Sequence, residues 1–99
     1  MKVLVCGGRQ YENASALRSC LEGIQRDHGI TEIIEGGATG ADTLAREFGE
    51  QKVIPVRTFP ADWQTYGRAA GPIRNRQMLE EGKPDLVVAF PGGRGTANW

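Results

Sequence analysis

The fold is decided by the stretch EIIEGGATGAD, residues 32–42, where a short apolar run passes into glycines and then into small and acidic residues. Residues 32–35 have the length and composition of a strand, and a glycine pair closes it. Thr39 or Asp42 can begin the helix that follows. Glycines in such a turn leave backbone N–H groups open to an anion at a helix N-terminus. The stretch therefore predicts a strand, a phosphate-binding turn and a helix.

The same alternation continues outward in both directions. Upstream, residues 2–6 predict a strand buried on both faces, and a helix capped by Asn13 or Ser15 runs to Gly29. Downstream, the pattern predicts a third strand over 52–58, a long loop over 59–72 with room for one helical turn, a third helix over 73–81 and a fourth strand over 85–90. A loop of that length in a compact domain is usually functional.

Strands that alternate with helices predict an α/β, Rossmann-like three-layer domain with a small parallel sheet and right-handed crossovers. The predicted strand order is three, two, one, four. A chain of 99 residues has room for one hydrophobic core, so we expect a single domain over residues 1–99. In such a sheet the loops after the strands lie at the carboxyl edge, and ligands bind where the winding reverses. The loops after the first and fourth strands should therefore face each other.

Charge and composition exclude several classes of protein. The 12 basic and 12 acidic side chains balance, which leaves no overall field to recruit duplex nucleic acid or an anionic membrane. No apolar run is long enough to span a bilayer and no signal peptide is evident, so we expect a cytoplasmic protein. Cys6 and Cys20 are expected to be small apolar fillers. With His28 as the only histidine, no metal site is expected.

The 14 glycines are about twice ordinary usage and gather directly after the apolar runs. Arginines accompany them, and a guanidinium can bind phosphate oxygens through two parallel hydrogen bonds. Arg74 and Arg76 fall near the predicted start of the third helix, where the helix dipole disfavours cations unless an anion compensates. The candidate ligand-binding residues are Gly7, Gly8, Arg9, Glu35, Gly36, Gly37, Thr39, Gly40, Asp42, Arg74, Arg76, Pro91, Gly92, Gly93, Arg94, Gly95 and Thr96.

Several polar and aromatic residues have a structural alternative. Either Glu35 or Asp42 could accept hydrogen bonds from ribose hydroxyls, but Asp42 could equally cap the second helix. Trp63 and Tyr66 could stack on a base or pack the long loop against the sheet. The chain has no serine or cysteine beside a histidine and no Walker lysine. Catalytic residues therefore stay unknown, and hydrolysis of a nucleoside triphosphate is not expected.

Six motifs occur in a characteristic order: Gly7-Gly8-Arg9, Glu35 to Asp42, Asp62-Trp63, Tyr66-Gly67, Ala70 to Arg76, and Phe90 to Thr96. In that order they resemble the YspA/YpsA-related branch of the SLOG superfamily. The resemblance implies a Rossmann-like domain that binds nucleotides or nucleotide-derived molecules, including NAD and ADP-ribose-type compounds. The chain is also similar to the Lonely Guy phosphoribohydrolases, which cleave a nucleotide N-glycosidic bond, and to the DNA-processing protein A group, which binds single-stranded DNA.

Two departures from these relatives bear on function. Arg74 resembles an arginine of the phosphoribohydrolases, but Trp99 stands where their glutamate would be. A carboxylate normally stabilises the oxocarbenium-like centre in glycosidic cleavage, so its absence weighs against a hydrolase. SLOG domains normally continue with a helix and at least one strand, whereas this sequence stops at Trp99. We therefore expect the fourth strand to be uncovered on one face and the chain to self-associate into a homo-oligomer.

The leading prediction is a binding or sensor module for a small nucleotide-derived ligand, with no separate cofactor. A phosphoribohydrolase-like enzyme is the first alternative. A single-stranded nucleic-acid-binding or assembly module is the second, and the zero net charge argues against it.

Overall fold

The computed structural model describes residues 1–91, in which strands and helices alternate along the chain. The strands are β1 (Lys2–Gly7), β2 (Glu32–Glu35), β3 (Val56–Thr58) and β4 (Leu86–Phe90). The helices are α1 (Ala14–His28), α2 (Ala41–Gln51), α3 (Trp63–Tyr66) and α4 (Ala70–Gly82), with a 3₁₀ turn, η1 (Gly67–Ala69), between the last two. Five candidate residues, Gly92, Gly93, Arg94, Gly95 and Thr96, lie outside the described residues.

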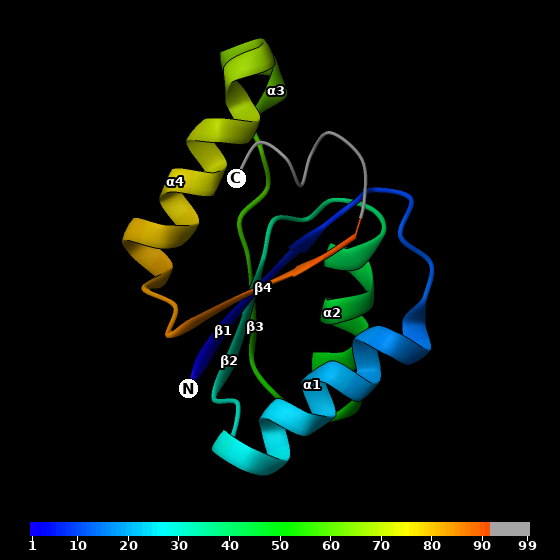
Figure 1. Cartoon of the computed structure of the whole chain (residues 1–99). Helices are drawn as coiled ribbons and strands as arrows, with labels where there is room; N and C mark the ends of the chain where they lie inside the picture. The colour runs from blue at the N-terminus through cyan, green and yellow to red at the C-terminus, as the bar shows by residue number, and fades with distance from the viewer. Residues whose placement is uncertain (92–99) are drawn as a thin grey trace.

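Within residues 1–91 the strands form one parallel sheet in the order β3-β2-β1-β4, which confirms the predicted arrangement. The chain winds outward from β1 to β3 through α1 and α2, and it returns past β1 to β4 through α4. Right-handed crossovers in opposite directions place their helices on opposite faces. Accordingly, α1 and α2 cover one face of the sheet and α4 covers the other (Figure 1). The domain is Rossmann-like, and its winding reverses between β1 and β4.

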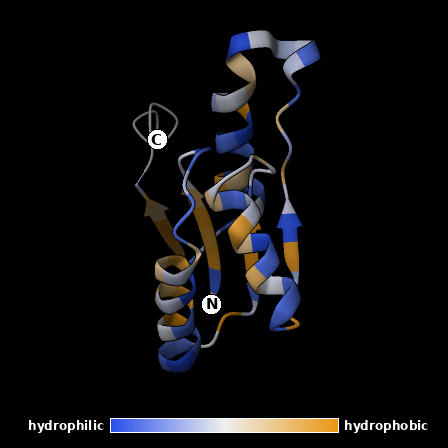
Figure 2. Ribbon diagram, turned by 90° about the vertical axis from the view of Figure 1, so that its right-hand side faces the viewer, coloured by the Kyte–Doolittle hydropathy of each residue, from blue (hydrophilic) through white to orange (hydrophobic). Residues whose placement is uncertain are grey.

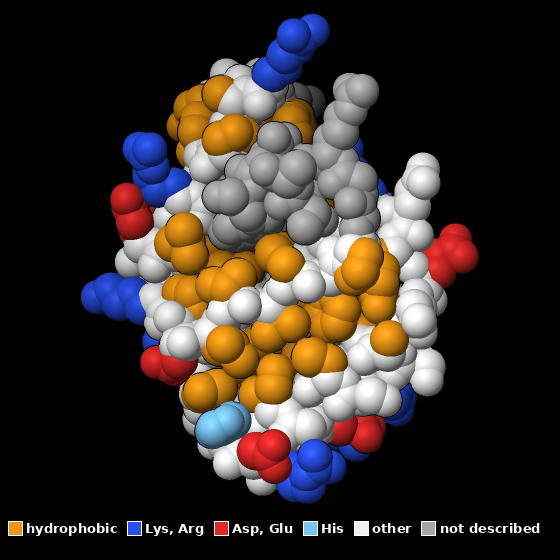
Figure 3. All heavy atoms as spheres, viewed as in Figure 1, with side chains coloured by type: hydrophobic (Ala, Val, Ile, Leu, Met, Phe, Trp, Pro, Cys, Tyr) orange, Lys and Arg blue, Asp and Glu red, His pale blue; other side chains and the backbone are white. Residues whose placement is uncertain are grey.

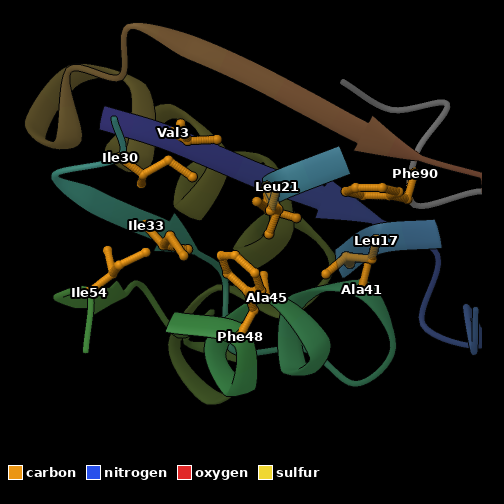
Figure 4. Close-up of a cluster of buried hydrophobic side chains, with 11 residues drawn as sticks. Val3, Leu17, Leu21, Ile30, Ile33, Ala41, Ala45, Phe48, Ile54 and Phe90 are labelled. Carbon is orange, nitrogen blue, oxygen red and sulfur yellow. The ribbon is translucent and has the colours of Figure 1, made fainter. Parts of the chain in front are cut away.

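Each face of the sheet has its own hydrophobic core. In the larger core, Leu17 and Leu21 of α1, Phe48 of α2 and Ile33 of the sheet belong to one cluster of buried side chains (Figure 4). The smaller core lies under α4 and consists of Leu4, Cys6, Ile34 and Met78. Successive strand residues point to opposite faces, so Ile33 and Ile34 enter different cores. Figure 2 shows the same division, with apolar strands inside helices that are hydrophilic on part of their surface.

The segment 59–72, predicted as one long loop, is mostly helical. Asp62 caps α3, because its carboxylate accepts a hydrogen bond from the backbone N–H of Thr65 at 3.1 Å. Pro72 lies in the first turn of α4, where a missing N–H would have had no intrahelical partner. The helix predicted over 73–81 therefore begins at Ala70, and the connection before α3 shortens to residues 59–62.

The other elements differ from prediction only at their ends. α1 begins after Asn13, whose side chain accepts a hydrogen bond from the Ala16 backbone N–H at 3.0 Å, as predicted. β3 is shorter than predicted because Val53 has a φ of 56°, a left-handed conformation that interrupts extended backbone. Pairing with β2 then starts at Val56. No helix within residues 1–91 is both long and apolar enough to cross a membrane.

Apolar side chains gather over β4 on the face shown in Figure 3. Leu86 and Val87 are 36% and 45% exposed, whereas Val3 and Leu4, their neighbours on β1, are fully buried. α4 packs over β2 and does not shield this strand. Among the described residues, β4 is therefore exposed at Leu86 and Val87, whereas Phe90 at its end is buried in the larger core. Self-association through this surface stays a prediction.

Candidate functional site

The carboxyl ends of β1 and β4 lie side by side at one edge of the sheet. Gly7 is opposite Phe90 in parallel register, so the loop after β1 leaves the sheet beside Pro91. A Cβ at Gly7 would come within 2.7 Å of the Cβ of Ala41, which explains a glycine where β1 meets α2. The predicted partners of this loop, residues 92–96, lie outside the described residues.

Two buried carboxylates hold the loop between β2 and α2. The backbone N–H groups of Gly36 and Ala38 donate to Oδ2 of Asp42 at 3.0 and 3.3 Å, and that of Gly37 donates to Oε1 of Glu35 at 2.6 Å. The sequence alone indicated a turn with its N–H groups open to phosphate. Three of those groups are instead bonded to carboxylates, so this part of the loop cannot also bind an anion.

The two carboxylates differ in the number of oxygens that have no hydrogen-bond partner. Glu35 is 1% exposed, and its second oxygen accepts a hydrogen bond from the Thr58 hydroxyl. Asp42 is 6% exposed and holds the loop through Oδ2 alone, so Oδ1 has no hydrogen-bond partner within residues 1–91. Asp42 is not the N-cap of α2, because Gly40 occupies that position and Asp42 is the second residue of the helix. Of these two carboxylates, only Asp42 therefore has an oxygen without a hydrogen-bond partner among the described residues.

Burial raises the pKa of Asp42 above its ordinary value of 3.8, and the nearby negative charge of Glu35 raises it further. The hydrogen bonds from the backbone of Ala38 and Gly36 and the positive charge of Arg74 lower it in part. Burial prevails over these stabilising contacts because it removes the charged form from water. A carboxyl group perturbed in this way beside a cavity is a candidate for a functional role.

The loops after β1 and β2 are fastened to each other. The Thr39 hydroxyl donates to the backbone carbonyl of Arg9 at 3.0 Å, and the Ala41 N–H donates to that of Gly8 at 3.3 Å. Gly40 has a φ of 77°, and a Cβ there would lie 2.2 Å from the carbonyl oxygen of Gly8, so glycine is required. The backbone N–H groups of Thr39 and Gly40 have no hydrogen-bond partner within residues 1–91 and can serve an anion.

Arg74 connects α4 to the glycine loop. Its Nη1 donates to the carbonyl oxygen of Gly36 at 2.6 Å, and its Nε donates to Oδ1 of Asn75 at 2.9 Å. Burial lowers the pKa of Arg74 below its ordinary value, while the charge of Asp42 acts in the opposite direction. A Cβ at Gly36 would collide with this guanidinium, so the glycine makes room for it. Arg74 is thus held at the rim of the site by packing and hydrogen bonds.

A cavity of about 390 Å³, here the outer cavity, opens between the glycine loop and the segment leading into α3. Its volume lies within the range of ordinary ligand pockets. The guanidinium carbon of Arg9 lies 5.4 Å from the ring centroid of Trp63, a cation–π arrangement at the cavity wall. The described residues that line the cavity are Arg9, Gly36, Gly37, Ala38, Thr39, Pro60, Ala61, Trp63 and Arg74.

A smaller cavity of about 60 Å³, here the inner recess, shares Arg9, Ala38 and Arg74 with the outer cavity. Its other described lining residues are Cys6, Gly7, Asp42, Asn75 and Met78. Burial, and secondarily the charge of Asp42, raises the pKa of the Cys6 thiol to about 11. The thiol therefore stays protonated at neutral pH and is a poor nucleophile.

The two cavities collect most, but not all, of the predicted residues that the structure describes. Arg76 is exposed and lines neither of them. Because α4 begins at Ala70, Arg74 and Arg76 lie in its second turn, too far along for the dipole argument that singled them out. Trp63 faces the outer cavity, whereas Tyr66 does not line it. Gly8, Glu35, Gly40 and Pro91 also line neither cavity, and Gly8 and Gly40 instead fix the loops to each other.

Sequence reasoning missed several lining residues, notably Asn75, Pro60, Ala61, Cys6 and Met78. Asn75 had a usable signal, since it stands between the two arginines of the motif Ala70 to Arg76. Cys6 and Met78 had none, because a buried apolar residue beside a cavity has the same pattern as one in the core. Among residues 1–91, no three His, Cys, Asp or Glu side chains gather as a metal site would require.

The fold and the position of the cavities define a Rossmann-like domain with its candidate site at the carboxyl edge of the sheet. A solved structure of phosphoribosylglycinamide formyltransferase from Bacillus Halodurans has the same fold, with a TM-score of 0.51 and 23% identity over 99% of this chain. That match covers 50% of the formyltransferase, so this chain spans about half its length. At this identity the likeness concerns the fold alone.

The family follows from two further comparisons. Residues 1–66 match the model of the YspA, cpYpsA-related SLOG family, and the chain belongs to that family. The Gene 61 protein of Mycobacterium phage D29 is 30% identical over 99 residues, which cover 94% of this chain and 78% of that protein. The family match includes the glycine loop, Asp42 and Trp63, and it ends before Arg74.

Proposed function

We propose that the protein binds a nucleotide or nucleotide-derived molecule of NAD or ADP-ribose type, as a sensor or binding module. The observation that carries this proposal is the outer cavity, where two arginines, an indole ring and a glycine loop surround about 390 Å³. Membership of a SLOG family and the Rossmann-like fold support it, because open α/β sheets bind their ligands at this edge.

The phosphates of such a ligand would lie between Arg9 and Arg74. These two residues border both cavities, and each guanidinium can form charge-assisted hydrogen bonds to phosphate oxygens. The backbone N–H of Thr39, which has no hydrogen-bond partner within residues 1–91, adds a donor on the loop side of the outer cavity. The chain has no net charge, so the attraction for an anion would come from this local pair of arginines.

A base would pack against Trp63. Its side chain is 49% exposed and lines the outer cavity, so it offers an apolar face without first having to leave a core. Pro60 and Ala61 extend this apolar wall. The cavity therefore combines one cationic and one apolar side, which matches the two ends of a nucleotide.

A phosphoribohydrolase-like activity is the second candidate, and the observation in its favour is Asp42. This carboxylate has a free oxygen in the inner recess, beside the arginine that would bind the phosphate. A carboxylate in that position can stabilise an oxocarbenium-like centre as a glycosidic bond breaks. Glu35 cannot take this role while both of its oxygens are bonded.

Calorimetric titration with ADP-ribose, NAD and AMP tests the binding proposal. Arg74→Ala should weaken binding by roughly 1.5–3 kcal/mol, the usual loss for a hydrogen bond to a charged group. Arg76→Ala is the matched control, since it removes the same charge from the same helix outside both cavities. Equal losses in the two variants would assign the effect to general charge. If none of the three compounds binds or raises the melting temperature at saturation, the proposal is wrong.

Chromatography of the same mixtures separates a binding module from an enzyme. Binding without released base or nicotinamide supports the module. Released base that disappears in Asp42→Asn supports the hydrolase, because that change removes the carboxylate charge and keeps the side-chain size.

A further inference from the structure

Arg9 has a backbone that is held in place and a side chain that is not. Its carbonyl oxygen accepts a hydrogen bond from the Thr39 hydroxyl at 3.0 Å, which anchors the loop after β1 to the glycine loop. Its guanidinium is exposed and, within residues 1–91, has neither a hydrogen-bond acceptor nor a salt-bridge partner. The guanidinium carbon lies over the ring of Trp63, 5.4 Å from the centroid. The side chain of Arg9 can therefore change partners while the loop that carries it stays fixed.

The indole face beneath Arg9 is a surface on which a base would stack. Arg9 and Trp63 both line the outer cavity, so the contact between them occupies part of the cavity wall. A base and a guanidinium exclude each other from one face of a ring, because each needs direct contact with that face. A base that stacks on this face of Trp63 therefore requires Arg9 to move.

The charge of Arg74 favours the position of Arg9 over the ring. Arg74 is held at the border of the two cavities by its hydrogen bond to the carbonyl of Gly36 at 2.6 Å. Burial is the main cause that lowers the pKa of Arg74, and the positive charge of Arg9 lowers it further, although Asp42 acts in the opposite direction. The two guanidiniums are thus close enough to repel each other.

An anion between the two arginines reverses this balance. It removes the repulsion and offers Arg9 charge-assisted hydrogen bonds. Such bonds are stronger than a cation–π contact at an exposed site. A phosphate group at the border of the two cavities should therefore draw Arg9 away from Trp63.

We infer that Arg9 determines the specificity of the outer cavity, because it covers Trp63 until a phosphate draws it away. This inference rests on the proposed nucleotide-binding function. A phosphate uncovers the ring and so strengthens binding of the base, and by linkage a base on the ring strengthens binding of the phosphate. The site thus favours a ligand that carries both groups over a nucleoside or an inorganic phosphate alone.

Titrations with two fragments test this coupling, with adenosine as the probe for the base and inorganic pyrophosphate as the probe for the anion. Trp99→Phe leaves Trp63 as the only tryptophan, so its fluorescence reports on the site. Saturating pyrophosphate should tighten adenosine binding about two- to fivefold, the factor that corresponds to an exposed cation–π contact. Arg9→Ala in the same background should bind adenosine alone more tightly by that factor, and its affinity for adenosine should no longer respond to pyrophosphate.

Arg68→Ala is the matched control. It removes an arginine from η1, next to α3, but Arg68 lines neither cavity, so the affinity for adenosine and its response to pyrophosphate should both be retained. Tighter adenosine binding after loss of an arginine is a result that a merely structural role for Arg9 would not produce. Equal gains in Arg9→Ala and Arg68→Ala would overturn the inference.

The other outcomes separate the coupling from the proposed function. If pyrophosphate leaves the affinity for adenosine unchanged while ADP still binds, the coupling is wrong and the proposed function stands. If adenosine, pyrophosphate and ADP all fail to bind, both are wrong. Where adenosine binds too weakly to titrate, pyrophosphate alone decides, because it should change the emission of Trp63 before Arg9→Ala and not after it. An unchanged emission, or a change that persists in Arg9→Ala, overturns the inference.

Discussion

The outer cavity has two walls of opposite character. The loop wall, residues 36–40, is tied to Glu35 and Asp42 and, through Thr39, to the loop after β1. The helical wall, residues 63–69, faces the cavity through Trp63, contains no buried residue in either α3 or η1, and packs on α4. It lies at the end of the molecule toward which the strands point (Figure 1). The loop wall is thus held by hydrogen bonds to buried side chains, whereas the helical wall has no buried residue of its own.

The two walls therefore differ in how easily their backbone can move. Backbone whose N–H groups are bonded to buried carboxylates opens at a larger free-energy cost than an exposed segment with few apolar contacts. Under the proposed function, the loop wall would be preorganised for the phosphate end of a ligand. The helical wall would adjust to the base, and ordering it on binding would oppose affinity.

The largest expected effect is on the loop wall, where Gly40→Ala should lower the free energy of unfolding by about 3 kcal/mol. Gly67→Ala is the control on the helical wall. Both glycines have positive φ, but a Cβ at Gly40 would overlap the backbone of Gly8 and Arg9, whereas nothing lies within 4 Å of one at Gly67. Gly67→Ala should then cost only about 1 kcal/mol of backbone strain. Urea denaturation measures both, and equal losses would show that the loop wall is not the tighter one.

A smaller effect is expected from a substitution on the helical wall, and it should appear in the affinity for the nucleotide and not in the stability of the fold. Trp63→Leu should weaken nucleotide binding by about 1–2 kcal/mol through lost stacking, and should change the free energy of unfolding by less than about 0.5 kcal/mol. Tyr66→Leu is the control, because Tyr66 is equally exposed on the same helix but lies outside the cavity. Comparable loss of affinity in both variants, measured by calorimetry, would contradict the assignment of the base to Trp63.

The smallest effect concerns pH and the carboxylate beneath the loop wall. Since the folded-state pKa of Asp42 is raised above 3.8, the folded protein binds more protons than the unfolded one just above that pH. The contribution of Asp42 to stability is therefore greatest at or below pH 3.8 and falls as the pH rises through the folded-state pKa. The melting temperature of the protein minus that of Asp42→Asn should decline across this window. A difference that rises with pH would mean that the loop hydrogen bonds prevail over burial.

The sheet could be predicted from sequence because its determinants are local. Apolar runs followed by glycines mark β1 and β2, and the alternation of strands and helices leads to the order β3-β2-β1-β4. The segment 59–72 could not, because its helices depend on a cap at Asp62 and on a proline tolerated in a first turn. Arg76 was predicted as a site residue because the helix was expected to begin at Ile73. The helix begins three residues earlier, at Ala70, so Arg76 lies in its second turn.

The sequence alone was sufficient to predict the architecture and the residue types at the carboxyl edge of the sheet, because hydrophobic period and glycine placement act over short distances. Only the tertiary structure decided which polar groups remain free. In the folded chain both carboxylate oxygens of Glu35 accept hydrogen bonds, whereas Asp42 uses only Oδ2 within residues 1–91. Arg74 donates to the carbonyl of Gly36, 38 residues away in the chain. Those choices depend on which side chains and backbone amides meet across elements, and no local pattern contains that information.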